Sequence, residues 1–259
     1  MLHINNIHKR FFKGTPDETI LFENLDLRIP QGQFVSIIGS NGSGKTTLLN
    51  LICGTLAMDG GEILLNDQPI STLKEYQRSR FIGRVFQDPA LGTAGNLTVL
   101  ENLSIANNKG KPYGLTPGIN NKDIPYFQSL LAPLGMGLEQ RLHQTCDTLS
   151  GGQRQALALL MSTMINPELL ILDEHTAALD PRSAQTIMEL TKKLVEEKHF
   201  TVIMVSHNLR FALDYGDRLL MMHEGQVILD AEGQDKSDLV LDDVLDRFYA
   251  ISIEVGNGI

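Results

Sequence analysis

A glycine-rich loop constrains what this chain can fold into more than any other feature of its sequence. Residues Gly39–Thr46 read GSNGSGKT and match the pattern GxxxxGK[ST] in full, between the apolar run Phe34–Ile38 and a helical pattern that starts near Lys45. The glycines let the backbone curl so that successive N–H groups face one point, at the positive end of a helix. A glycine turn that merely links a strand to a helix is the plain alternative. The full pattern in this context favours a phosphate-binding loop.

The residue types in this loop predict how it holds a nucleotide. Lys45 is expected to reach the β- and γ-phosphates, and the hydroxyl of Thr46 is expected to bind Mg²⁺, a hard cation that prefers oxygen ligands. The residues expected to contact the nucleotide here are Gly39, Ser40, Asn41, Gly42, Ser43, Gly44, Lys45, Thr46 and Thr47.

Two carboxylates follow a second apolar run. Leu169–Leu172 is typical of a strand buried on both faces, and Asp173 and Glu174 come directly after it. In an open α/β sheet, ligands bind at the carboxyl ends of the strands. Asp173 is therefore expected to hold Mg²⁺ through water, and Glu174 to orient and polarise an attacking water. Alone, the pair could also be a solvated acidic turn; beside the phosphate loop it predicts a catalytic site.

Composition excludes several classes of protein. The 22 Lys and Arg against 31 Asp and Glu give a net charge of −9, which argues against nucleic-acid binding as the main function. The sequence contains no stretch near the ~18 uncharged apolar residues of a membrane span, and its first residues show no secretory signal pattern. Cys53 and Cys146 are expected to be free thiols in a reducing compartment.

Local patterns indicate alternating strands and helices with one helical insertion. Strands are expected near 2–7, 20–29, 81–86, 169–172 and 201–205, and a hairpin around 223–225. Helices are expected near 97–106, 124–142, 154–165 and 182–198, the last with Asp180 as its N-cap. Between the first two helices, residues 107–121 are rich in Gly, Asn, Lys and Pro, which predicts an exposed loop.

A second helix N-terminus suited to a phosphate follows the insertion. Leu149–Gln153 reads LSGGQ just before a helical segment, with Ser150 as the expected N-cap and two glycines that leave backbone N–H groups open. One nucleotide does not need two such cradles from the same chain. The second cradle is therefore interpreted as serving a nucleotide held by another chain.

With these motifs in order, the sequence resembles the ATP-binding subunits of ABC transporters, most closely those of bacterial importers, from about Leu2 to Asp230. The matching motifs are the phosphate loop, the Q-loop residue Gln87 in VFQDP, the signature residues Ser150, Gly151, Gly152 and Gln153, the strand-end pair Asp173 and Glu174, the D-loop residue Asp180, and the switch histidine His207. Phe11 occupies the position where the family often has an aromatic ring that stacks on adenine.

The resemblance implies a fold and a domain division. The fold is an α/β P-loop NTPase with a RecA-like core, a small antiparallel β subdomain and an inserted α-helical signature subdomain. The ATPase domain spans 1–234, with its antiparallel part at about 1–35 and 60–70 and its helical insertion at about 90–165. Residues 235–259 form a short tail helix, which could close over the core or pack on a partner.

The resemblance also implies a mechanism. ATP and Mg²⁺ would be the cofactors, with Thr46, Gln87 and Asp173 around the metal. Glu174, His207 and Gln87 would be the catalytic residues. A head-to-tail dimer, expected to be a homodimer, would form two composite ATP sites, each of which joins one chain's phosphate loop to the other's signature.

Partners and location follow from the same resemblance. The segment of about 88–103 would meet an integral membrane permease, an extracytoplasmic substrate-binding protein would deliver cargo, and nucleic acid would not be a partner. The chain would lie peripherally on the cytoplasmic face of the cell membrane. The cargo is expected to be an amino acid or a similar small solute.

One departure and two alternatives remain. Family members commonly have Pro after the catalytic Glu, whereas this chain has His175. A non-transport cytosolic ABC ATPase, such as the one of iron–sulfur cluster assembly, has a similar size and is the main alternative. A binding module without turnover is the other, and the presence of Glu174 argues against it.

Overall fold

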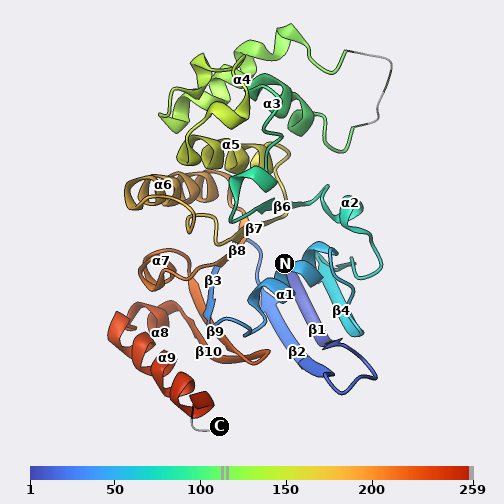
Figure 1. Cartoon of the computed structure of the whole chain (residues 1–259), viewed down its shortest axis with the longest axis vertical. Helices are drawn as coiled ribbons and strands as arrows, with labels where there is room; N and C mark the ends of the chain where they lie inside the picture. Colours follow the sequence, from blue (N-terminus) through green and yellow to red (C-terminus); the bar gives the residue numbers. More distant parts are fainter. Residues whose placement is uncertain (112–113, 115–116, 257–259) are drawn as a thin grey trace. The chain divides into compact units, whose positions relative to one another are not determined.

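The computed structural model describes residues 1–111, 114 and 117–256, with the side chains of 249–256 outside that description. The chain divides into two compact units (Figure 1). Unit 1 comprises Met1–Ser79 and Thr201–Ile259, and unit 2 comprises Arg80–Phe200. Part of the loop expected over 107–121, at 112–113 and 115–116, lies outside the described residues. Of the described residues, no helix has the length and apolar character needed to cross a membrane.

Unit 1 begins with an antiparallel sheet of strand order β2-β1-β4-β5. Strand β1 (Leu2–Phe11) pairs with β2 (Thr19–Ile29) on one side and with β4 (Gly60–Leu65) on the other, and β4 pairs with the short β5 (Gln68–Pro69). Alternate side chains of β1 are buried, as expected for a strand with one face on a core. The strands predicted near 2–7 and 20–29 are confirmed, and β1 continues to Phe11.

A second sheet in unit 1 carries the phosphate loop. Strand β3 (Phe34–Gly39) pairs in parallel with β8 (Thr201–Val205) and β9 (Arg218–His223), and β9 pairs antiparallel with β10 (Gln226–Glu232). All residues of β3 and β8 are buried, which explains their continuous apolar sequences. Helix α1 (Lys45–Cys53) follows β3 and ends at Gly54, whose left-handed φ of 79° closes the helix. The short helix α2 (Glu75–Arg78) ends the first segment of this unit.

The C-terminal part of unit 1 folds back on this sheet. Helices α7 (Leu209–Asp214), α8 (Gly233–Ser237) and α9 (Leu241–Gly256) follow strands β8 and β10 (Figure 1). Val244 of α9 is completely buried in one apolar cluster with Ile38 and Met221, and Phe248 packs against it. The segment expected as a tail helix over 235–259 thus contains α9, and the Val244 side chain of α9 packs into the core of its own unit.

Unit 2 combines two parallel strands with a helical layer. Strand β6 (Ile82–Val85) pairs with β7 (Leu169–Asp173), and helix α5 (Gly151–Thr163) packs between this pair and α3 (Val99–Asn107). Helix α4 (Ile124–Leu131) contacts α3 and α5, and α6 (Pro181–Lys198) contacts α5. The core between the helices is built from buried apolar side chains, including Val99, Leu103, Phe127, Leu131, Leu157 and Ile187.

The helical stretch expected over 124–142 is broken. Helix α4 ends at Leu131, and the chain continues in 3₁₀ turns at Ala132–Leu134 and Leu138–Gln140. Gly135 and Gly137 adopt left-handed φ values of 67° and 71°, which end regular helix in this segment. Helix α3 begins two residues later than expected, because Thr98 and Glu101 form a capping box at its start.

Candidate nucleotide-binding site

The phosphate loop connects β3 to α1 through backbone positions that only glycine fits. A Cβ on Gly39 would lie 2.3 Å from the carbonyl oxygen of Met222, and a Cβ on Gly44 would lie 2.9 Å from the buried ring of Phe22. Gly44 also has a φ of 104°, which side-chain-bearing residues rarely adopt. The curl of the loop is therefore fixed by close packing against β9 and β2.

Lys45 anchors the same loop from its inner side. Its ammonium donates hydrogen bonds to the carbonyl oxygens of Gly39 and Ser40, both at 2.8 Å, and to the hydroxyl of Ser43 at 3.3 Å. Lys45 is only 4% exposed, whereas Asn41, Gly42 and Thr46 are exposed and Ser40 and Thr47 are half-buried. The loop thus presents its tip and the Thr46 hydroxyl to solvent around a buried positive charge.

Two further predicted residues of unit 1 lie at strand ends. Phe11 ends β1 and is half-buried, and the Lys9 ammonium lies 5.3 Å from the centre of its ring. The neighbouring Phe12 is 69% exposed and has a left-handed φ of 53°, so it leaves the strand. His207 is exposed in the turn between β8 and α7, where the Ser206 hydroxyl accepts a hydrogen bond from the Asn208 N–H. Of the two adjacent rings, that of Phe11 is therefore the one held against neighbouring side chains.

The acidic pair of unit 2 ends strand β7 as expected. Asp173 is 9% exposed, and one of its oxygens accepts a hydrogen bond of 2.7 Å from Arg84 Nη2. Glu174 follows with a left-handed φ of 48°, an uncommon conformation for a residue with a side chain. Such conformations cost roughly 1–3 kcal/mol and persist where surrounding contacts fix them.

His175 is part of the interior of unit 2. His175 is 2% exposed, and its Nε2 lies 3.3 Å from the hydroxyl of Thr191 on α6. Because that hydroxyl already donates to the carbonyl of Ile187, His175 Nε2 is the donor to Thr191. Burial lowers the pKa of His175 to about 4, so the imidazole is neutral near pH 7. The residue that replaces proline therefore ties the chain after Glu174 to α6 without adding a charge.

The signature segment forms a capped helix start. The Ser150 hydroxyl accepts from the Gln153 N–H at 3.3 Å, and Gln153 Oε1 accepts from the Ser150 N–H at 3.2 Å. Gly151 is exposed, and Gly152 is buried, where a Cβ would lie 3.1 Å from the Ser183 hydroxyl. Helix α5 therefore begins at an exposed turn that is satisfied by its own side chains.

Gln87 and Asp180 occupy the two remaining predicted positions of unit 2. Gln87 is exposed, two residues beyond the end of β6. Asp180 caps α6, accepting from the N–H groups of Arg182 and Ser183 at 3.2 and 3.1 Å. Hydrogen bonds from the Ser183 side chain and backbone hold the pKa of Asp180 below its ordinary value. The N-cap predicted from the sequence is confirmed.

Two buried polar residues that no sequence motif singles out, Gln155 and Arg84, bind groups close to the predicted site residues of unit 2. Gln155 on α5 is completely buried, and its Nε2 donates to the carbonyl oxygens of Phe86 at 3.0 Å and His175 at 2.6 Å. Arg84 interrupts the otherwise apolar strand β6 and binds Asp173. A charge within a buried strand and an amide on the apolar face of a helix both signal a required partner, because burying either alone is costly.

The predicted site residues divide between the two units. Unit 1 carries the phosphate loop, Phe11 and His207, and unit 2 carries Gln87, the signature, the acidic pair and Asp180. The oxygen atoms of Thr46, Gln87 and Asp173 are ligands of the kind that Mg²⁺ prefers. In the described parts of the chain, no group of three His, Cys, Asp or Glu residues could hold a metal by itself. Each unit by itself therefore carries oxygen donors of the kind that suits magnesium beside nucleotide phosphates, Thr46 in unit 1 and Gln87 and Asp173 in unit 2.

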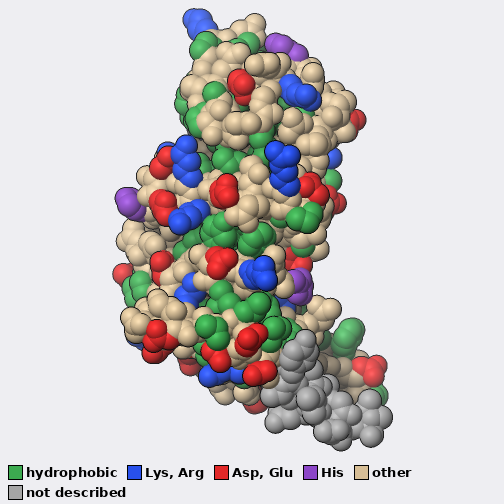
Figure 2. Space-filling view, turned by 90° about the vertical axis from the view of Figure 1, so that its left-hand side faces the viewer, with side chains coloured by type: hydrophobic (Ala, Val, Ile, Leu, Met, Phe, Trp, Pro, Cys, Tyr) green, Lys and Arg blue, Asp and Glu red, His purple; other side chains and the backbone are tan. Residues whose placement is uncertain are grey.

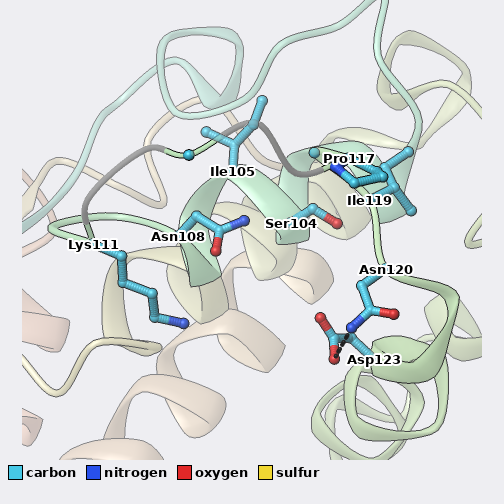
Figure 3. Close-up of a pocket in the computed structure, with 10 residues that line it drawn as sticks. Ser104, Ile105, Asn108, Lys111, Pro117, Ile119, Asn120 and Asp123 are labelled. Atoms are coloured by element: carbon cyan, nitrogen blue, oxygen red, sulfur yellow. Dashed lines mark hydrogen bonds between the residues drawn. The ribbon is translucent and has the colours of Figure 1, made fainter.

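A separate hollow in unit 2 does not involve these residues. It measures about 550 Å³ and lies beside the end of α3, lined there by Ser104, Ile105 and Asn108 and across from them by residues 117–120 and Asp123 (Figure 3). Asn120 donates to Asp123 at its rim. Its lining is mostly neutral, so the candidate nucleotide site rests on the loops described above and not on this cavity.

Comparisons with known proteins show which family the chain resembles. The model of the family described as ABC transporter matches residues 22–177. A tyrosine transport ATP-binding protein from Clostridioides difficile (strain R20291) is 47% identical over 252 residues, which cover 97% of this chain and 100% of that protein. A phosphonates import ATP-binding protein from Ruegeria sp. (strain TM1040) is 35% identical over 96% of this chain and 95% of its own. A solved dimeric ATP-binding cassette, in a post-hydrolysis state with ADP and phosphate, is 30% identical with a TM-score of 0.74, covering 90% of this chain and 98% of that one.

Proposed function

The chain belongs to the ATP-binding subunits of ABC transporters, and from that membership we propose that it powers the uptake of an amino acid or a similar small solute. As a member of this family it binds ATP with Mg²⁺ and hydrolyses it. The observation that carries the cargo proposal is the full-length similarity, at 47% identity, to a tyrosine transport ATP-binding protein. The phosphonates import relative supports the direction of transport.

Each part of the candidate site has a proposed role in hydrolysis. Lys45 and the N–H groups of its loop hold the β- and γ-phosphates, and Thr46, Asp173 and Gln87 offer oxygen ligands to Mg²⁺. The metal, when bound, neutralises negative charge on the phosphate oxygens. Glu174 accepts a proton from the attacking water, and its fixed backbone conformation holds the carboxylate in place.

His207 and the signature complete the proposed machinery. His207 contacts the γ-phosphate and orients the same water. The exposed N-terminus of α5, with Ser150 and Gly151, faces an ATP molecule held by a second copy of the chain. A relative of 30% identity that was solved as a dimer with ADP and phosphate supports this arrangement.

The proposed membrane partner is a separate permease, which the chain would meet on the cytoplasmic face of the membrane through residues 88–103. Leu91, in the short turn Pro89–Leu91, supports this surface because its side chain is 69% exposed. On the face drawn in Figure 2, Lys and Arg side chains are interspersed with Asp and Glu, without the clustered basic surface that a nucleic acid would need. A substrate-binding protein on the other side of the membrane would select the cargo.

The test is native co-purification of the chain from gently solubilised membranes, with mass spectrometry of what accompanies it. We expect a multi-span permease with the wild type, and at least about tenfold less of it with Leu91→Asp, because a charge would enter an apolar contact. Ile20→Asp is the matched control, since Ile20 is 47% exposed on β2, outside the proposed surface. Recovery of soluble assembly factors alone, with the chain absent from membranes, would contradict transport and favour a cytosolic ABC ATPase.

A further inference from the structure

Strand β6 places a positive charge beside the proposed magnesium ligand. Arg84 lies opposite Ile171 in the parallel pairing of β6 and β7. Since successive side chains of a strand alternate between faces, Ile171 and Asp173 share the face of the sheet on which Arg84 lies. The guanidinium reaches Asp173 along this face, with 2.7 Å between Nη2 and Oδ2. The pair is largely withdrawn from water, with 14% of the Arg84 side chain and 12% of the Asp173 side chain exposed.

The contacts around Arg84 hold its guanidinium in one place. Its central carbon lies 4.8 Å from the centre of the Phe86 ring, within the range of a cation–π contact. The carbonyl of Phe86 is in turn bound by the buried Gln155 amide, at 3.0 Å. Phe86 directly precedes Gln87, so the support of Arg84 is also the segment that carries another proposed ligand of the metal.

We propose that Arg84 is a positioning residue that competes with Mg²⁺ for the Asp173 carboxylate. This inference rests on the proposed role of Asp173 as a metal ligand. An arginine keeps its charge at every physiological pH, and a fixed positive charge within hydrogen-bond distance of a carboxylate weakens the binding of a second cation there. The withdrawal of the pair from water strengthens this effect, because such charges are screened less than exposed ones.

The competition has a functional consequence. Asp173 retains the metal only when nucleotide phosphates supply further negative oxygens that offset the charge of Arg84. The metal therefore binds together with ATP and weakly without it.

The test measures metal affinity directly, with no turnover. Mn²⁺, which takes the same oxygen ligands and is visible by electron paramagnetic resonance, is titrated into the full chain with β,γ-imido-ATP, an analogue that is not hydrolysed. We expect Arg84→Met to lower the dissociation constant for Mn²⁺ by about tenfold, because one nearby positive charge is removed. Arg84→Lys should remain within about threefold of the wild type, because a positive charge stays near Asp173 even though the stacking on Phe86 is lost. An unchanged or higher dissociation constant in Arg84→Met would overturn the proposal.

Three further variants make the result decisive. Arg218→Met is the matched control: Arg218 binds Asp230 in unit 1 with an equivalent Nη2–Oδ2 contact of 2.5 Å, and its loss should leave Mn²⁺ affinity unchanged. If Arg84→Met does not fold, Arg84→Gln provides the same reading, because it removes the charge and retains a donor to Asp173. Asp173→Asn distinguishes a failure of the proposed metal-ligand role of Asp173 from a failure of the proposed competition by Arg84. If it leaves Mn²⁺ affinity unchanged, the proposed role of Asp173 fails; if it weakens Mn²⁺ and Arg84→Met does not strengthen it, only the competition fails.

Discussion

Helices α1 and α5 both begin at a glycine-containing turn, but they satisfy their first N–H groups differently. Within the described chain, no side chain caps α1, whose N-cap is Gly44 in a left-handed conformation. Helix α5 begins with a reciprocal capping box, in which Ser150 and Gln153 each bind the backbone of the other. An uncapped start leaves donors for an anion, whereas a capped start is stable without one.

This difference matches the proposed roles of the two helices, in which α1 binds the nucleotide of its own chain and α5 the nucleotide of a second chain. The start of α1 is held in shape by packing, since Gly39 and Gly44 lie close against β9 and Phe22, and no described side chain caps its first N–H groups. The start of α5 is held by its own side chains and lies exposed, as suits a surface that meets ATP only when a second chain delivers it. The comparison therefore predicts that variants at α1 affect nucleotide binding by the monomer, whereas variants at α5 affect association.

The variant with the largest expected effect, Glu174→Gln, separates ATP binding from ATP hydrolysis. Glu174→Gln retains the shape of the side chain and removes the base, so we expect turnover to fall by about 10²–10⁴-fold while ATP affinity is retained. ATP hydrolysis and the binding of a fluorescent ATP analogue are measured on the same preparation. This variant should accumulate the ATP-bound dimer, in which both helix starts are engaged. Near-normal turnover would show that Glu174 is not the base.

The second prediction tests α5 directly, in the Glu174→Gln background. Ser150→Arg places a long cation at the exposed start of α5, and we expect ATP-driven dimerisation to weaken by at least about 100-fold, because the helix start can no longer approach the phosphates. Nucleotide affinity of the monomer should stay within about twofold of the wild type. Light scattering coupled to gel filtration measures the first quantity, and fluorescence titration the second. Loss of monomer binding would mean that the signature acts on the ATP of its own chain.

The helix starts could be predicted from the sequence because they depend on contacts between residues that lie within three or four positions of each other. The N-caps at Ser150 and Asp180 and the end of α1 at Gly54 follow from residue types at fixed offsets. The apolar runs of β3 and β7 likewise identify strands that are buried throughout. These features locate the phosphate loop and the acidic pair without any knowledge of tertiary contacts.

The supports behind the site could not be predicted in the same way. Arg84 meets Asp173 across 89 residues of sequence, and the pairing depends on the register of two strands. Gln155 binds carbonyl groups that lie 69 and 20 residues away. The packing of Val244 into one cluster with Ile38 spans a still larger separation in sequence, so the sequence indicates a tail helix but not what it packs against. A single sequence indicates which residues need a partner, but the fold determines which partners they contact.

The third prediction tests whether packing maintains the start of α1. Gly44→Ala requires a Cβ 2.9 Å from the Phe22 ring, which is completely buried, and a φ of 104°, so we expect a loss of about 2 kcal/mol in the free energy of unfolding. Gly42→Ala is the matched control, because it has a φ of 80° but its Cβ would enter open space among the described residues; its cost should be about 1 kcal/mol. Urea unfolding measures both. Equal losses in the two variants would mean that backbone strain, and not contact with Phe22, fixes the loop.

The smallest expected effect tests the capping box of α5. Ser150→Ala removes the acceptor for the Gln153 N–H, and we expect a loss of about 1 kcal/mol in the free energy of unfolding. Ser150→Thr retains a hydroxyl at the same position and should restore most of that stability. Urea unfolding of the isolated chain, without nucleotide, is the appropriate measurement, because the box is complete within one chain. If Ser150→Ala left the stability of the monomer unchanged and weakened only the ATP-bound dimer, the hydroxyl would act only on the second chain's nucleotide. Helices α1 and α5 would then differ in whose nucleotide they bind and not in how their first N–H groups are capped.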